Sequence, residues 1–239
     1  MEQIKIQTGA NLSRLLQSTV NIPQAFTELV KNSIQNFSTS CRIDFNDSCA
    51  TIIDDGQGFD HEKDENGMSG FEKYFVFGNS YDLTGGKGVK LGQMGIGGKL
   101  ANDKLSNEID IHWTIETKNK HGKCFLVKYK PDGVEFLNEY SPELTEITTE
   151  ECSITTDTGT KITIATLKNN IQKEGWPSAA IKGELCTFFG FLLPQLEKEG
   201  KKFDLILNGE SLDFSYKLPG SNIPIIRREF EYDYYSEKR

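Results

Sequence analysis

The sequence lacks clustered cysteines, abundant histidines, long apolar runs and an excess of positive charge. With five cysteines that show no C-x-x-C spacing and only three histidines, a structural zinc site is not expected. No segment approaches the roughly 18 consecutive apolar residues of a membrane span, so a membrane partner is not expected either. Lys and Arg total 27 against 35 Asp and Glu, and the net charge of -8 argues against nucleic acid as a partner of this domain.

The composition predicts a soluble cytoplasmic protein with one large domain. An odd number of scattered thiols and the lack of an N-terminal signal peptide fit a reducing compartment. The 239 residues, 36% hydrophobic and 26% charged, suffice for a domain with its own core. We expect this domain to span residues 1–218, followed by a tail or the start of a further region over residues 219–239.

The apolar pattern predicts helices on one face of a mostly antiparallel, mixed sheet. Helical spacing indicates helices over residues 12–16, 23–37, 69–77, 97–105 and 177–193. Alternation and β-branched residues indicate strands over residues 4–7, 41–45, 50–54, 109–117, 124–129, 134–137, 160–167, 203–207 and 211–218. The links between the strands that follow residue 109 are too short for helical crossovers, so the fold class is an α+β two-layer sandwich.

Local signals refine several of these boundaries. Pro23 suits the first turn of the second helix. An apolar stripe follows it at helical spacing, formed by Phe26, Leu29, Val30, Ile34 and Phe37. Pro194 is expected to end the last helix. Asn208-Gly209 predicts a tight hairpin between the last two strands.

Glu28 and Asn32 lie four residues apart on the second predicted helix. Positions i and i+4 share a helix face, so both side chains can point at one phosphate group. ATP hydrolysis needs a positioned water and a divalent cation, for which Glu28 would be the general base and the amide oxygen of Asn32 the ligand of Mg²⁺. The alternative is that both residues are the solvated flank of an amphipathic helix.

A turn rich in aspartate and glycine, residues 54–58, follows the third predicted strand. The carboxylate of Asp54 can accept the exocyclic amine of adenine, and Gly56 and Gly58 let the backbone pass close beneath the ring. Asp55 is expected to face solvent. An ordinary turn is the alternative, while a calcium loop is excluded because the D-x-D-x-D-G spacing is absent.

A glycine loop precedes the helix predicted from residue 97 and offers backbone N–H groups to phosphate oxygens. It matches neither the Walker loop, which needs a lysine at position 98, nor the dinucleotide loop, which needs glycine or alanine at position 100. The candidate nucleotide-binding residues of this loop and helix are Gly92, Gln93, Gly95, Ile96, Gly97 and Lys99. The polar, glycine-bearing residues 60–97 are typical of a mobile active-site lid.

These motifs occur in an order that resembles the GHKL ATPase superfamily of gyrase, heat-shock chaperones, histidine kinases and MutL. The matching residues are Glu28 and Asn32, then Asp54, Gly56 and Gly58, then Gly92, Gly95 and Gly97, then Gly159 and Thr160. The resemblance covers roughly residues 10–215 and implies the Bergerat fold, with ATP or ADP and Mg²⁺ under the lid and Thr160 joining Asp54 around the adenine. Residues 77–80 and 92–95 are most similar to the microrchidia and heat-shock chaperone branches.

The resemblance also implies a nucleotide-dependent homodimer in a conformational cycle, with an unknown protein client. Two departures predict slow hydrolysis. Gln35 stands where many relatives have aspartate, and relatives take a γ-phosphate lysine from a following transducer domain, for which Lys87, Lys90 and Lys99 are the local substitutes. The alternatives are a histidine-kinase-like catalytic domain, a non-hydrolysing adenine-nucleotide sensor and an enzyme unrelated to ATP.

Overall fold

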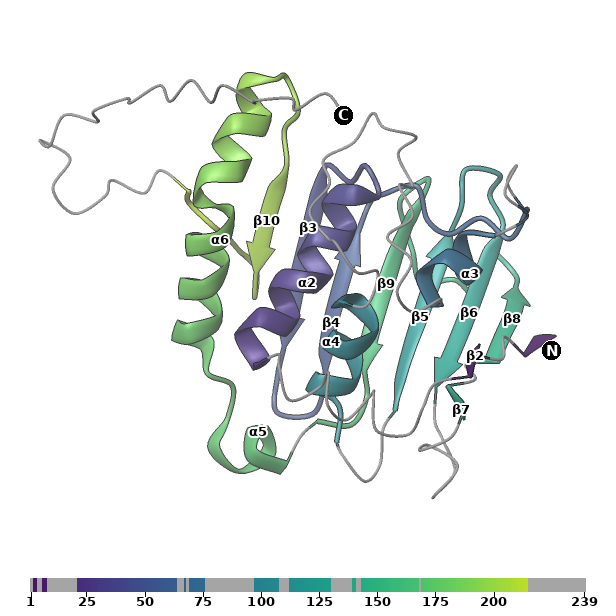
Figure 1. Ribbon diagram of the computed structural model, residues 1–239, viewed down its shortest axis with the longest axis horizontal. Helices are drawn as coiled ribbons and strands as arrows, with labels where there is room; N and C mark the ends of the chain where they lie inside the picture. The colour runs from purple at the N-terminus through teal and green to yellow at the C-terminus, as the bar shows by residue number, and fades with distance from the viewer. Residues whose placement is uncertain are drawn as a thin grey trace, which may run out of the picture.

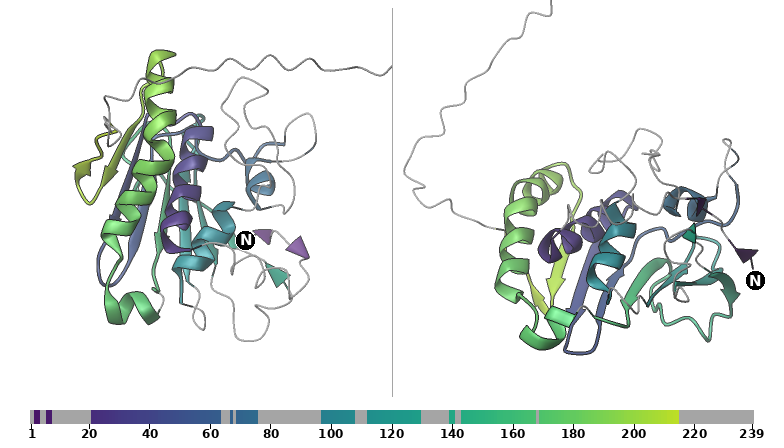
Figure 2. Two further views of the ribbon diagram at one scale, coloured as in Figure 1. Left: turned by 60° about the vertical axis from the view of Figure 1, so that its left-hand side comes forward. Right: turned by 60° about the horizontal axis from the view of Figure 1, so that its bottom comes forward.

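The computed structural model describes residues 2–3, 6–7, 21–63, 67, 69–75, 97–107, 112–129, 139–140, 143–167 and 169–214. Within these residues, helices cover one face of a broad sheet, as Figure 1 shows and the turned views of Figure 2 confirm. The helices are α2 (Ile22–Gln35), α3 (Gly70–Phe75), α4 (Gly97–Leu105), α5 (Asn169–Glu174) and α6 (Ser178–Lys198). The predicted α+β two-layer sandwich is thereby confirmed.

The main sheet has the order β1-β8-β6-β5-β9-β4-β3-β10-β11, and β2 and β7 form a separate pair. Its pairs are antiparallel except β10 with β3, which is parallel. The strands are β1 (Glu2–Gln3), β2 (Ile6–Gln7), β3 (Ser40–Phe45), β4 (Ala50–Asp54), β5 (Trp113–Lys118), β6 (Cys124–Tyr129), β7 (Glu139–Tyr140), β8 (Glu143–Ile147), β9 (Gly159–Ile164), β10 (Asp204–Leu207) and β11 (Glu210–Ser211).

Helix α2 begins where the sequence predicts and ends earlier. Asn21 caps it by accepting a bond from the backbone N–H of Gln24, whose side chain reaches back to the N–H of Asn21. The stripe up to Val30 is buried against the sheet. Phe37 was predicted to continue the stripe, but it lies beyond the helix with a φ of 60° and is 45% exposed. The chain must turn there to enter β3, and this turn overrides the helical pattern.

Helix α6 continues through Pro194, which corrects the predicted end at residue 193. Proline removes one helical hydrogen bond and usually breaks the helix. Here Leu193 and Leu196 are both buried, on either side of that position, and this packing keeps the last turn on the core. No helix among the described residues is long and apolar enough to cross a membrane.

The strands confirm most of the predicted order. The Asn208-Gly209 hairpin is present, and both residues have the positive φ that a tight primed turn requires. Strand β8 and helix α5 were not predicted, because their segments are mostly polar; among the residues whose burial is described there, Leu144 and Ile171 are the buried ones. The predicted helix over residues 12–16 and strand over residues 134–137 lie outside the described residues.

Strand β9 lies between β4 and β5 at the centre of the sheet. Its register places Thr160 opposite Asp54 on one side and opposite Thr117 on the other. All three side chains are buried. Three polar residues therefore meet at one end of the central strands, beneath the helical layer.

Candidate functional site

Glu28 and Asn32 project from the middle of α2, one turn apart, as predicted. The Oε1 atom of Glu28 accepts a hydrogen bond from Nζ of Lys31 at 2.6 Å. The side chain of Glu28 remains 29% exposed, so a water molecule can reach it. Sequence reasoning missed Lys31, although its spacing of three residues from Glu28 is the usual signal of a helical ion pair.

Asn32 contacts the first turn of α4. A Cβ atom built on Gly98 would lie 2.3 Å from Nδ2 of Asn32 and 2.8 Å from the hydroxyl oxygen of Tyr74. Only a glycine at this position lets the asparagine amide approach the helix backbone so closely. The structure therefore brings the predicted metal ligand to the N-terminus of the helix that follows the glycine loop.

Asp54 ends β4 and is buried. Its carboxylate accepts hydrogen bonds from the N–H of Gly56 at 3.0 Å and from the hydroxyl of Ser33 at 2.9 Å. Burial raises the pKa of Asp54 to about 6, although both hydrogen bonds lower it. A buried carboxylate held by neutral donors can still accept a further donor, such as an amine.

Ser33 joins α2 to the end of β4, and sequence reasoning missed it. It directly follows Asn32 on α2 and is itself buried. Its bond to Asp54 ties the helix that carries Glu28 and Asn32 to the strand end that carries Asp54. A small polar residue on the buried side of an apolar helix was the signal available in the sequence.

Thr160 has a buried hydroxyl for which the structure supplies no partner. The residue is 4% exposed, and its Oγ1 atom makes no hydrogen bond within the described part of the chain. Buried polar groups are nearly always paired with protein, water or ligand. Because Thr160 faces Asp54 across the β4–β9 ladder, the pair can bind one ligand that carries both a donor and an acceptor, with or without a bridging water.

Protein contacts alone already require glycine at positions 56 and 58. A Cβ on Gly56 would lie 2.6 Å from the hydroxyl of Ser38, and one on Gly58 would lie 2.3 Å from the carbonyl oxygen of Lys118. Gly58 also has a φ of 66°. The sequence predicts glycine at these positions because the backbone would pass beneath an adenine ring. The protein contacts are a second reason for glycine there, and this reason needs no ligand.

Gly58→Ala is expected to lower the free energy of unfolding by about 2 kcal/mol more than Gly122→Ala, as measured by chemical denaturation. Both glycines have a positive φ, but nothing lies within 4 Å of the Cβ position at Gly122, so the comparison isolates the clash with Lys118. Equal losses in the two variants would contradict a tight turn at this position.

Asp55 does not simply face solvent, which corrects the prediction. Its carboxylate accepts bonds from the backbone N–H groups of Thr39 and Ser40, both at 2.8 Å, and from the Thr39 hydroxyl. These bonds lower the pKa of Asp55 against the opposing effect of its partial burial. Asp55 therefore fixes the start of β3 beside the turn.

The glycine loop is only partly described. Gly92, Gln93, Gly95 and Ile96 lie outside the described residues, as do most of residues 60–97. Gly97 begins α4 as predicted, and Lys99 belongs to its first turn by backbone position. The helix predicted over residues 69–77 is α3, which Ser69 and Glu72 cap reciprocally.

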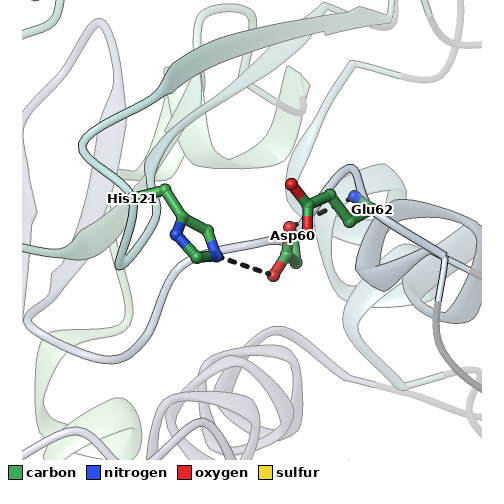
Figure 3. A group of neighbouring side chains, drawn as sticks. All are labelled: Asp60, Glu62 and His121. Carbon is green, nitrogen blue, oxygen red and sulfur yellow. Dashed lines mark hydrogen bonds and ion pairs between the residues drawn. The ribbon is translucent and has the colours of Figure 1, made fainter.

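A second cluster lies on the surface at the start of the predicted lid, where Asp60, Glu62 and His121 bring ligand atoms within 4.8 Å of one another (Figure 3). Nζ of Lys120 lies 3.6 Å from Oδ2 of Asp60, and Nε2 of His121 lies 3.9 Å from the same oxygen. Lys120 thus supplies a positive charge for the Asp60 carboxylate. These are surface contacts between the segment after β4 and the β5–β6 turn, with an exposed ion pair from Lys120 to Asp60 among them.

Comparison with solved structures shows the same fold in type II topoisomerases. The ATPase and transducer domains of DNA topoisomerase II from Balamuthia mandrillaris superpose with a TM-score of 0.52 at 18% identity, covering 80% of this chain and 48% of that chain. The ATPase region of Saccharomyces cerevisiae topoisomerase II bound to dexrazoxane gives 0.52 at 17% identity, with the same coverages. The present chain thus spans about half the length of these proteins, and such identities establish the fold alone.

No curated protein matches the sequence. A family model does match, over residues 20–160. This range includes α2, the Asp54 turn and α4, and it ends at Thr160. This range covers more than half of the chain and contains every predicted site motif. The chain belongs to the family of histidine kinase-, DNA gyrase B- and HSP90-like ATPases.

Proposed function

We propose that this chain binds ATP and hydrolyses it with Mg²⁺, and that its lid, residues 60–97, closes on the nucleotide to drive a conformational or dimerisation cycle in a larger protein or complex. The observation that carries this proposal is the buried, unpaired hydroxyl of Thr160 opposite Asp54. Family membership supports a GHKL-type ATPase domain, with ATP as its nucleotide.

The adenine end of the site is assigned to the strand termini. The carboxylate of Asp54 would accept the exocyclic amine of adenine, and the hydroxyl of Thr160 would complete the contact directly or through a water. Gly56 and Gly58 hold the turn that forms the edge of this end. The Thr160 hydroxyl fits this ligand because it needs a partner that the described chain does not provide, and the Asp54 carboxylate fits because it is buried and can accept a donor beyond Ser33 and Gly56.

The phosphate end is assigned to α2 and to the start of α4. Glu28 would orient the attacking water and take its proton, and Asn32 would hold Mg²⁺ through its amide oxygen. Mg²⁺ bound there would neutralise the charge that develops on the phosphates. The asparagine fits this role because its amide lies against Gly98 at the start of α4, and an amide oxygen is a ligand that Mg²⁺ accepts. Gly92, Gln93, Gly95, Ile96, Gly97 and Lys99 would bind the phosphates.

The cycle that follows is proposed from the family. Ordering of a lid around a bound nucleotide is a recurring switch, and it would couple the nucleotide state to a homodimer or to a client protein. We propose, from the similarity of residues 77–80 and 92–95, that the chain belongs to the microrchidia or chaperone branch, and, from its scattered cysteines, that it works in the cytoplasm. Residues 1–218 would form the ATPase domain, with residues 219–239 as a tail or the start of a transducer region.

Isothermal titration with ATP and ADP, each with and without Mg²⁺, tests the binding step. We expect both nucleotides to bind, with ATP strengthened by Mg²⁺, and we expect slow release of phosphate in a parallel assay. Absence of binding for both nucleotides would end the proposal. Binding without phosphate release would identify the chain as an adenine-nucleotide sensor instead.

A further inference from the structure

Lys31 on α2 contacts both the proposed general base and a second helix. Its Nζ atom lies 2.6 Å from Oε1 of Glu28 and 5.5 Å from the ring centroid of Phe188 on α6. The side chain of Lys31 is only 11% exposed. An ammonium group with little water around it is held firmly by a carboxylate on one side and a ring face on the other.

This ion pair differs from the ordinary surface pairs of a helix. Exposed pairs of this spacing contribute little, because water and salt screen them. Lys31 is largely buried, and removing either partner of such a pair leaves a poorly solvated charge. The pair therefore restricts Glu28 to one side-chain arrangement. Among the described residues, the second oxygen of Glu28 accepts no hydrogen bond, so it remains available to a water molecule.

We infer that Lys31 is a positioning residue for Glu28, and that Phe188 on α6 holds Lys31 in place. This inference rests on the proposed function, because it takes Glu28 as the base of ATP hydrolysis. A base acts only when its oxygen lies within hydrogen-bonding distance of the attacking water, and small displacements slow the reaction strongly. Lys31 binds one carboxylate oxygen and thereby aims the other.

The arrangement also links α6 to the chemistry. The ring of Phe188 is 41% exposed at the surface of the helical layer, yet it contacts the ammonium group that holds the base. A displacement of α6 relative to α2 would remove this contact and loosen Glu28. The rate of hydrolysis then depends on the position of a helix that carries none of the proposed nucleotide ligands.

Lys31→Met in the full chain tests the first link. Methionine keeps an apolar stem of similar length and removes the charge, so packing is largely retained. We expect kcat for ATP hydrolysis to fall about tenfold or more while KM and the ATP dissociation constant stay nearly unchanged. Lys31→Arg keeps the cation and should restore most of the turnover. A purely structural lysine would instead change thermal stability and leave kcat intact.

Phe188→Ala, compared with Phe191→Ala, tests the second link. Both variants remove an exposed phenylalanine from α6, but Phe191 is 75% exposed and makes no ring contact with Lys31 in the described structure. We expect kcat to fall in Phe188→Ala and to stay normal in Phe191→Ala. Equal kcat values in these two variants, or normal kcat in Lys31→Met, would overturn the inference alone. Absence of turnover in the unsubstituted chain would overturn the proposed function as well.

Discussion

Glu28→Gln is expected to abolish most ATP turnover while leaving nucleotide binding almost intact. A general base contributes roughly 10² to 10⁴ in rate, and glutamine cannot accept the proton of the attacking water. Nucleotide binding should persist, because the base acts on the water and not on the adenine or the ribose. Glutamine is a sharper test than alanine, because its amide oxygen can still accept the hydrogen bond from Lys31, whereas alanine would leave that buried ammonium group unpaired.

The measurement combines phosphate release under single-turnover conditions with isothermal titration of ATP and Mg²⁺. Glu197→Gln is the matched control, since it removes the same charge from an exposed position on α6. The control should behave as the unsubstituted chain in both assays. If Glu28→Gln loses nucleotide binding instead, Glu28 holds the ligand and is not the base.

The positions of the main site residues follow from local sequence patterns. A spacing of four residues put Glu28 and Asn32 on one helix face, and a carboxylate at the end of an apolar run put Asp54 at a strand terminus. Thr160, which follows the other motifs in the sequence, was placed beside Asp54 by resemblance to the family. The β4–β9 register agrees with that placement. In each case a short-range signal or an ordered set of motifs carried the information.

The contacts that join these residues could not be read from the sequence. The hydrogen bond from Ser33 to Asp54 links positions 21 residues apart and exists only because α2 packs on the end of β4. The carboxylate of Asp55 binds the backbone at Thr39 and Ser40 because the antiparallel pairing of β3 with β4 brings the start of β3 beside the end of β4. Pro194 shows the converse, since burial of Leu193 and Leu196 outweighs a strong local signal for a helix end. Contacts between different secondary-structure elements decided the first two cases, and packing of α6 on the core decided the third.

Asp54→Asn is expected to weaken ATP binding by about a hundredfold or more, because a charged acceptor for the adenine amine is lost. The same change should stabilise the protein without nucleotide. Burial raises the pKa of Asp54 from about 3.8 to about 6, so near neutral pH the fold contains a charged carboxylate at an energetic disadvantage. A pKa shift of this size corresponds to a cost of about 3 kcal/mol in the free energy of unfolding. Asparagine carries no charge, so Asp54→Asn should regain part of this free energy.

The pH dependence of stability gives this prediction a definite sign. Between pH values of about 4 and about 6, Asp54 binds a proton in the folded protein but not in the unfolded chain. The free energy of unfolding therefore decreases through this residue as the pH rises across that window. Asp54→Asn removes this contribution. The difference in the free energy of unfolding between the variant and the unsubstituted protein should thus be small near the lower pH of this window and largest at pH values above it.

Chemical denaturation across this window and isothermal titration of ATP near neutral pH measure the two effects. Asp47→Asn, in the exposed turn between β3 and β4, removes the same charge and should change neither quantity. General damage to the fold would lower stability and affinity together, whereas Asp54→Asn should raise one and lower the other. A variant that binds ATP normally would show that Asp54 serves the turn at Gly56 and not the adenine. A loss of both quantities would show that its charge is needed for folding, and the carboxylate would then be structural.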